Sequence, residues 1–244
     1  MLCRLFTSLL AISSLATAAP AQSVEEVVAR ANQARGGVEK LRALQAVRMT
    51  GTMTIASQAN APVTRITMEK KRPRRSRFEF TAQGRTGVQA YDGREAWGIP
   101  PVAGARPERL PEEMAGELVN EADIEGPLVD HKAKGHKVAL VGREKLDGKD
   151  AVRLRVTLKS GDAEDVLLDA TSYLELRSER RRVVRGTEIE LETRFGDYRE
   201  VGGLLWPHTI EVGPKGRPEK QLVTFEKIEV DPAIDDARFR MPLR

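Results

Sequence analysis

From about residue 47 to the end of the chain, apolar and polar residues alternate with a period of two, and this pattern limits the folds that the chain can adopt. The clearest example is AVRLRVTLK at residues 151–159, where Val152, Leu154, Val156 and Leu158 share one side and polar residues occupy the other. Such alternation is typical of strands with one buried face and one solvated face. Similar patterns predict strands at residues 78–80, 88–91, 188–195 and 221–230.

Short turn sequences separate these segments. Examples are Asp92-Gly93, Asp147-Gly148, Gly202-Gly203 and the segments 160–162 and 214–216. Links of hairpin length join antiparallel neighbours, so the sequence predicts roughly ten to twelve antiparallel strands.

Three segments have helical patterns instead. Ser23 followed by Glu26 matches a capping box and predicts a helix that ends at Gly36-Gly37. Residues 38–44 predict a second, short helix, and Pro111 begins a third over residues 109–126. These helices are thin cover for so many strands. We therefore predict a mainly β (α+β) fold, in which a curved sheet closes partly on itself and the helices cover its apolar concave face.

The first 21 residues have the pattern of a secretory signal peptide. A basic start precedes an apolar run from Leu5 to Leu15 that is too short to span a bilayer, and small residues follow up to Ala21. Cleavage after Ala18 or after Ala21 fits this pattern. The only cysteine, Cys3, lies inside the segment and precedes the apolar run, so we expect neither a disulfide nor a lipid anchor. We expect an exported, soluble, periplasmic protein with residues 22–244 in one domain; an uncleaved membrane anchor is the alternative.

The stretch YDGREAW at residues 91–97 allows a catalytic interpretation, because Asp92 and Glu95 flank the same turn beside two aromatic residues. However, Asp-Gly is a strong hairpin signal, and turn formation accounts for the aspartate. We therefore interpret the stretch as a hairpin.

No other catalytic or metal-binding motif stands out. His131, His136 and His208 lack the spacing of a metal site, and no G-x-S-x-G, P-loop or G-x-G-x-x-G sequence occurs. We predict that the protein is not an enzyme and that it uses no cofactor and no metal.

Two basic stretches, KKRPRRSR (70–77) and RSERRRVVR (177–185), occur in a chain with a formal net charge of +4. In an exported protein, anionic lipid headgroups or an acidic partner protein are better candidates than nucleic acid. The favoured interpretation of both stretches is that they are solvated strand edges, whose charges block edge-to-edge pairing with another sheet.

Several segments together resemble a known family. They are residues 34–53, 91–100, 140–162, 165–177, 197–212 and 231–242, in this order. This set resembles the outer-membrane lipoprotein-sorting proteins of the LolA/LolB-like superfamily. The resemblance implies an open antiparallel half-barrel whose hydrophobic concave face is covered by helices. It also implies a carrier that moves the acyl chains of lipoproteins or other lipids across the periplasm, from an inner-membrane donor toward an outer-membrane acceptor.

The resemblance also implies a residue that closes the lid, whereas the candidate lipid-binding residues come from the strand and helix patterns. An arginine on an early strand that holds the lid closed is expected at Arg48 or Arg65. Sequence alone leaves open whether the aromatic cluster is a cavity wall or ordinary core. The candidate lipid-binding residues are Phe78, Phe80, Tyr91, Trp97, Ile99, Met114, Leu118 and Trp206.

Other roles stay open at this stage. The main alternative is a sensor module that binds lipid or lipoprotein and docks onto a partner without transferring cargo; a hydrolase is a third, poorly supported possibility. We expect a monomer that contacts membranes only peripherally.

Overall fold

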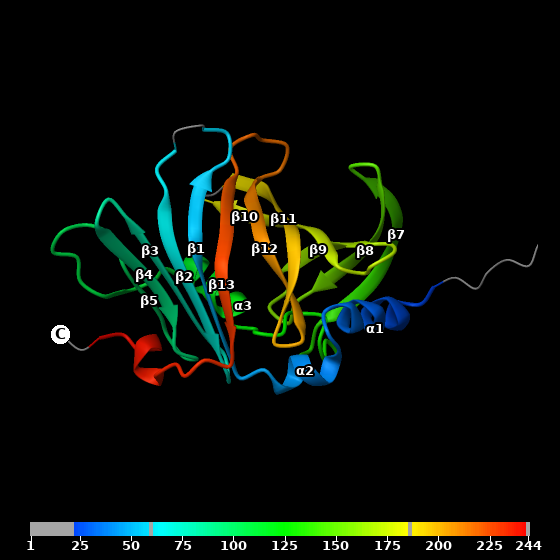
Figure 1. Cartoon of the computed structure of the whole chain (residues 1–244), viewed down its shortest axis with the longest axis horizontal. Helices are drawn as coiled ribbons and strands as arrows, with labels where there is room; N and C mark the ends of the chain where they lie inside the picture. Colours follow the sequence, from blue (N-terminus) through cyan, green and yellow to red (C-terminus); the bar gives the residue numbers. More distant parts are fainter. Residues whose placement is uncertain (1–21, 59–60, 185–186, 243–244) are drawn as a thin grey trace, which may run out of the picture.

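All strands in the described part of the chain form one open, curved antiparallel sheet (Figure 1). The computed structural model describes residues 22–58, 61–184 and 187–242, so the predicted signal peptide lies outside the described residues. The sheet has 13 strands. They are β1 (Ala46–Ile55), β2 (Thr64–Lys71), β3 (Arg75–Ala82), β4 (Arg85–Tyr91), β5 (Ala96–Ile99), β6 (Glu108–Arg109), β7 (Lys137–Leu146), β8 (Lys149–Thr157), β9 (Ala163–Asp169), β10 (Glu175–Val184), β11 (Thr187–Val201), β12 (Leu204–Pro214) and β13 (Gln221–Val230).

The strand order shows how the sheet is connected. Neighbouring strands are consecutive in the chain, except that β1 pairs with β13 in the middle of the sheet. The first and last strands thus join two meanders, β1–β6 and β7–β13. The predicted curved, mainly β fold is confirmed, with slightly more strands than expected because two-residue β6 is too short to show alternation.

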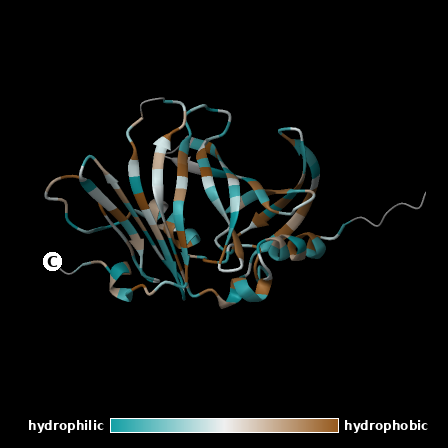
Figure 2. Cartoon of the chain, in the orientation of Figure 1, coloured by the Kyte–Doolittle hydropathy of each residue, from teal (hydrophilic) through white to brown (hydrophobic). Residues whose placement is uncertain are grey.

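The two faces of the sheet differ in what covers them. We call the face that packs against the helices the inner face, and the opposite one the outer face. On β8, Val152, Leu154 and Val156 are fully buried on the inner face, as the alternation predicts. Figure 2 shows apolar and polar bands alternating along the strands.

Two helices at the start of the chain cover part of the inner face. Helix α1 (Val24–Ala34) begins at Ser23, whose hydroxyl accepts a hydrogen bond from the Glu26 N–H, and the Glu26 carboxylate accepts one from the Ser23 N–H. The predicted capping box is therefore confirmed. Helix α1 packs on β8 and β9 through Val27 and Val28. Helix α2 (Val38–Ala43) packs Leu41 onto β1, β12 and β13.

A third helix, α3 (Glu112–Glu121), lies behind the central strands in Figure 1 and contacts β3, β4 and β5. It is shorter than the predicted 109–126. Pro111 precedes it, and residues 122–136, here called the α3–β7 connection, form turns. Within the described part of the chain, no helix is long and apolar enough to cross a membrane.

The outer face is lined by ion pairs that run across strands. On β8, the Arg153 guanidinium lies 2.8 Å from carboxylate oxygens of both Glu144 and Asp165. Lys220 pairs with Glu192 at 2.5 Å, and both side chains are buried. The 3-10 helix η1 (Asp236–Phe239) packs on the outer side of β3.

Candidate functional site

The inner face carries apolar side chains that the helices cover only in part. The side chains of β1, β2, β12 and β13 form a buried cluster together with α2 and the α3–β7 connection. Around this cluster lie half-buried apolar residues, which are Val38, Met53, Met68, Phe78, Phe80, Val201, Ile210 and Val230. The inner face is thus apolar but incompletely sealed, which distinguishes it from an ordinary core.

Two stacked phenylalanines form the clearest part of this surface. Phe78 and Phe80 are two apart on β3, so they share the inner face, and their ring centroids are 5.6 Å apart. Phe80 lies opposite Gly87 of β4, where a Cβ would overlap its ring. The glycine therefore lets the ring lie flat on the neighbouring strand.

Helix α3 crosses the inner face and contacts both limbs of the sheet. Glu121 pairs with Lys70 of β2 at 2.8 Å, and Glu117 pairs with Arg180 of β10 at 3.2 Å. Lys70 and Arg180 are separated by five strand spacings, about 24 Å along a flat sheet. The two glutamates are only about 6 Å apart along the helix. The curl of the sheet and the length of the Lys70 and Arg180 side chains together let one helical turn contact both limbs.

Further contacts fix α3 to β3 and to the turn that precedes it. The Ser76 hydroxyl donates to the Leu118 carbonyl at 2.8 Å, and the Arg74 guanidinium donates to the Val119 carbonyl at 2.8 Å. The Leu118 side chain is buried beneath the helix, whereas Met114 is exposed.

The register brings five of the eight predicted lipid-binding residues to the inner face or to the buried side of α3. Tyr91 pairs with Ser76, which places it on the inner face, and Trp206 belongs to the buried inner cluster. The five are Phe78, Phe80, Tyr91, Leu118 and Trp206.

Trp97 and Ile99 lie on the outer face, so the prediction that they share a wall with Phe78 and Phe80 is wrong. In the YDGREAW hairpin, Tyr91 pairs with Ala96, and Trp97 pairs with Ala90. An offset of one residue moves a side chain to the opposite face. Trp97 is 1% exposed, and its indole N–H donates to the Phe239 carbonyl at 2.8 Å.

The same hairpin supports the structural interpretation of its acidic residues. The Asp92 carboxylate accepts hydrogen bonds from the backbone N–H groups of Arg94 and Glu95, both at 2.8 Å. This is the hydrogen-bonding pattern of an Asx turn. Glu95 pairs with Arg109.

Neither predicted lid-locking arginine reaches a helix. Arg48 lies on the outer face, where its guanidinium donates to the buried Glu69 carboxylate at 2.8 Å. Arg65 is exposed on the outer face between Thr52 and Thr81. The alternation of β1 and β2 explains both placements, because the neighbours Met49 and Ile66 point inward.

The helices are instead fastened by Arg72, in the β2–β3 turn. Its guanidinium donates to the Leu44 carbonyl at the end of α2 at 2.7 Å and to the Glu125 carboxylate at 2.5 Å. Arg35, at the end of α1, donates to the Glu125 carbonyl at 2.7 Å. Lys134 also pairs with the Glu125 carboxylate, at 3.2 Å. Glu125, buried in the α3–β7 connection, thus joins all three helical segments.

The basic side chains of the stretch 70–77 therefore already have partners within the protein. Besides Lys70, Arg72 and Arg74, Arg75 pairs with Asp236 at 2.9 Å and Arg77 pairs with Glu79 at 2.7 Å. The interpretation as a free docking surface is not favoured here. Sequence reasoning did not recognise that these arginines fasten the helices. The available signal was the high density of arginines beside a turn, but the partners of Arg72 and Arg75 lie far away in the sequence.

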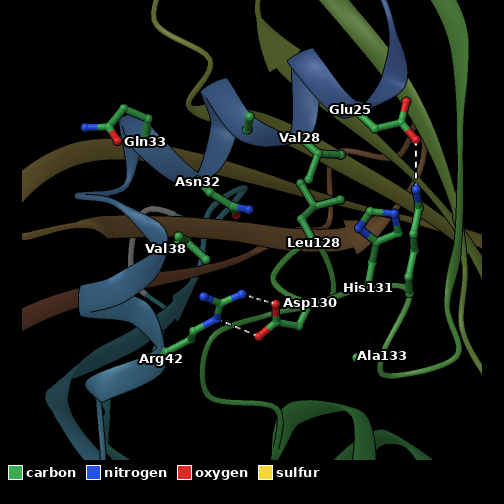
Figure 3. A pocket seen from close by; sticks show the side chains of 12 residues that line it. Glu25, Val28, Asn32, Gln33, Val38, Arg42, Leu128, Asp130, His131 and Ala133 are labelled. Atoms are coloured by element: carbon green, nitrogen blue, oxygen red, sulfur yellow. Dashed lines mark hydrogen bonds and ion pairs between the residues drawn. The ribbon is translucent and has the colours of Figure 1, made fainter.

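A separate pocket lies between α1, α2 and residues 128–133 (Figure 3). Its volume is about 570 Å³. Val28, Val38 and Leu128 contribute its apolar lining, and ion pairs cross its rim. These pairs are Arg42 with Asp130 at 2.6 Å and Glu25 with Lys132 at 3.0 Å.

The histidines do not converge on a common site. His131 lines the pocket, the His136 ring accepts the Lys159 N–H at 3.0 Å, and His208 is buried near the Trp206 carbonyl. Among the described residues, no group of three His, Cys, Asp or Glu side chains is placed to hold a metal ion.

The inner face also encloses ionisable groups on β9–β11. Burial, reinforced by the negative charge of Glu164, raises the pKa of the Glu175 carboxyl to about 8, although the Arg35 charge opposes this shift. Burial likewise raises the pKa of Glu164 and of Tyr198. Glu175 is consequently protonated at neutral pH, and this part of the inner face carries less negative charge than its composition implies.

Comparison with solved structures shows which known folds this architecture resembles. The sequence matches no protein-family model and no curated protein. The fold is similar to that of a LolA superfamily protein from Nitrosomonas europaea, with a TM-score of 0.62, 16% identity and coverage of 90% of this chain and 98% of that chain. It is also similar to a Vibrio parahaemolyticus domain whose proposed role is outer membrane lipoprotein sorting. There the TM-score is 0.58 and the identity 14%, over 88% of this chain and 94% of that chain.

A DUF1329 family protein from Desulfovibrio piger is a third structural neighbour. Its TM-score is 0.60 at 14% identity, over 89% of this chain and 97% of that chain. The fold of the chain is therefore LolA-like, as the sequence resemblance implied.

Proposed function

We propose that this protein is a periplasmic carrier that binds the acyl chains of lipoproteins or other lipids on its inner face and delivers them toward the outer membrane. The observation that carries the proposal is the set of half-buried apolar side chains around the buried cluster of the inner face. The LolA-like fold and the names of its structural neighbours add support.

The energetics of the inner face suit a carrier. An acyl chain gains about 0.8 kcal/mol for each buried CH₂ group. The two ion pairs of α3 have partly exposed partners and contribute only about 0.2–1 kcal/mol each. Moving α3 also breaks its hydrogen bonds to Ser76 and Arg74 and uncovers Leu118, and burial of a long acyl chain offsets these costs. Loss of ligand and helix mobility offsets part of the gain, which keeps the cargo exchangeable.

The first test compares the two faces of the sheet. The double variant Phe78→Ser, Phe80→Ser removes the inner-face rings, and Trp97→Phe is the matched control on the outer face. We expect the inner-face variant to bind a fluorescent fatty acid at least about tenfold more weakly, because it loses the two half-buried rings against which an acyl chain would pack. The Trp97→Phe protein should bind like the wild type. Equal binding by all three folded proteins, with folding checked by circular dichroism, would refute the inner-face assignment.

The second test concerns delivery. A carrier accelerates transfer of a labelled lipid from donor to acceptor vesicles, whereas a sensor module binds the lipid without accelerating transfer. Binding without transfer would favour the sensor role. Export belongs to the same proposal: we expect the protein recovered from the periplasm to lack the signal peptide, with cleavage after Ala18 or Ala21, which mass spectrometry of the intact chain measures.

A further inference from the structure

Two cationic side chains lie on the inner face, where apolar residues dominate. Lys70 of β2 has a side chain that is 17% exposed, and that of Arg180 on β10 is 36% exposed. Both pair with carboxylates from α3 rather than from the sheet: Lys70 with Glu121, and Arg180 with Glu117.

The two carboxylates belong to the same helix, which covers the inner face. Glu117 and Glu121 are four residues apart, so they project from the same side of α3. The Glu121 side chain is 48% exposed. An ion pair whose carboxylate is this exposed to water is weaker than a fully buried pair, and another anion of suitable geometry can replace the glutamate.

Moving α3 away from the sheet would leave the two cations without these partners. Glu164, which lies opposite Arg180 on β9, is a poor substitute because burial raises its pKa. Glu175 is protonated at neutral pH, since its pKa is about 8. The inner face without α3 therefore favours an anionic group.

The apolar surface begins beside these cations. On the inner face, Lys70 is followed along β2 by Met68 and Ile66, and Met68 pairs with Phe78 of β3. An anionic group held at Lys70 thus directs an attached alkyl chain onto the half-buried apolar residues. This adjacency of charge and apolar surface matches an amphiphile.

We infer that Lys70 and Arg180 form a binding site for the anionic group, a carboxylate or a phosphate ester, of a long-chain amphiphile, and that Glu117 and Glu121 occupy this site when no cargo is bound. The inference rests on the proposed function, because it names the chemical class of the cargo.

The experiment measures displacement of a fluorescent fatty probe by three ligands of equal chain length below their micelle-forming concentrations. The ligands are hexadecanoate, hexadecyl phosphate and hexadecanol. We expect either anionic ligand to bind at least about tenfold more tightly than the alcohol, because hydrogen bonds to charged groups are stronger. Whichever of the two anions binds more tightly shows whether the natural ligand carries a carboxylate or a phosphate ester.

Two pairs of substitutions test which residues produce the preference for anions, and a third pair is the control. Lys70→Gln with Arg180→Gln should abolish the preference for anions, so that this variant binds either anion no more tightly than it binds hexadecanol. Glu117→Gln with Glu121→Gln should enlarge the preference, because the competing carboxylates are gone. Lys145→Gln with Arg155→Gln is the control that removes two exposed cations from β7 and β8, and it should retain the wild-type preference.

The outcomes separate this inference from the proposed function. Binding of hexadecanol with no preference for the anions overturns the inference and leaves the proposed function standing. A preference that survives in the Lys70 and Arg180 variant, or that stays unchanged in the Glu117 and Glu121 variant, also overturns it. Failure of all three ligands to bind overturns the proposed function and the inference together.

Discussion

The enclosed Glu175 carboxyl makes the stability of the protein depend on pH in a predictable direction. Burial on the inner face raises its pKa from 4.5 to about 8, with the charge of Glu164 adding to the shift and that of Arg35 opposing it. Tyr198 approaches from β11, where its hydroxyl donates to the Glu175 carbonyl at 2.9 Å. The folded protein thus holds a proton that the unfolded chain releases.

The sign and the size of this pH dependence follow from proton linkage. Between about pH 4.5 and pH 8 the folded state binds one more proton at this site than the unfolded state, so the free energy of unfolding falls as pH rises. The slope is at most about 1.4 kcal/mol per pH unit, which gives an upper limit of about 5 kcal/mol over the window. Above about pH 8 the site is ionised in both the folded and the unfolded state, and the free energy of unfolding stops falling on its account.

Glu175→Gln tests this reasoning, because glutamine has nearly the same shape and does not ionise. Urea unfolding followed by circular dichroism at several pH values gives the free energy of unfolding of the variant and of the wild type. We expect the variant to gain stability relative to the wild type as pH rises from about 5 to 8. The control is Glu200→Gln, an exposed residue on β11, whose curve should stay parallel to the wild type. A parallel curve for Glu175→Gln would refute the reasoning.

Three further predictions concern stability, all measured as free energies of unfolding in urea. Arg72→Ala should cost about 2–4 kcal/mol, because the buried Glu125 carboxylate loses one of its two cations; a cost below about 1 kcal/mol would contradict the fastening role. Trp97→Phe should cost about 1–2 kcal/mol by removing the hydrogen bond to the C-terminal segment, and weaker lipid binding would contradict its outer-face placement. Gly36→Ala should cost about 2 kcal/mol or more, since φ is +118° and a Cβ would overlap the Gly203 carbonyl; unchanged stability would contradict that geometry.

Local patterns predicted the strands and their faces because both depend on neighbouring residues. The alternation at 151–159 correctly placed Val152, Leu154 and Val156 together, and the spacing of Phe78 and Phe80 correctly placed them on one face. The resemblance to lipoprotein-sorting proteins gave the correct fold, although no single motif carried it.

The relation between strands was harder to predict. Trp97 was assigned to the wrong wall because its face depends on which residue pairs with Tyr91 across the turn, and a shift of one residue reverses it. Arg72 was missed as a fastening residue because its partner, Glu125, lies 53 positions away in the sequence. Only the folded sheet brings these side chains together.

The central claim is that the inner face holds an acyl chain, and native mass spectrometry tests it most directly. The protein is purified from the periplasm without detergent, its intact mass is measured, and bound molecules are then extracted into organic solvent. We expect an adduct in the mass range of a phospholipid or an acylated peptide, lost on extraction and reduced in the Phe78→Ser, Phe80→Ser variant. A bare protein mass that stays bare after incubation with lipid vesicles would contradict the carrier account.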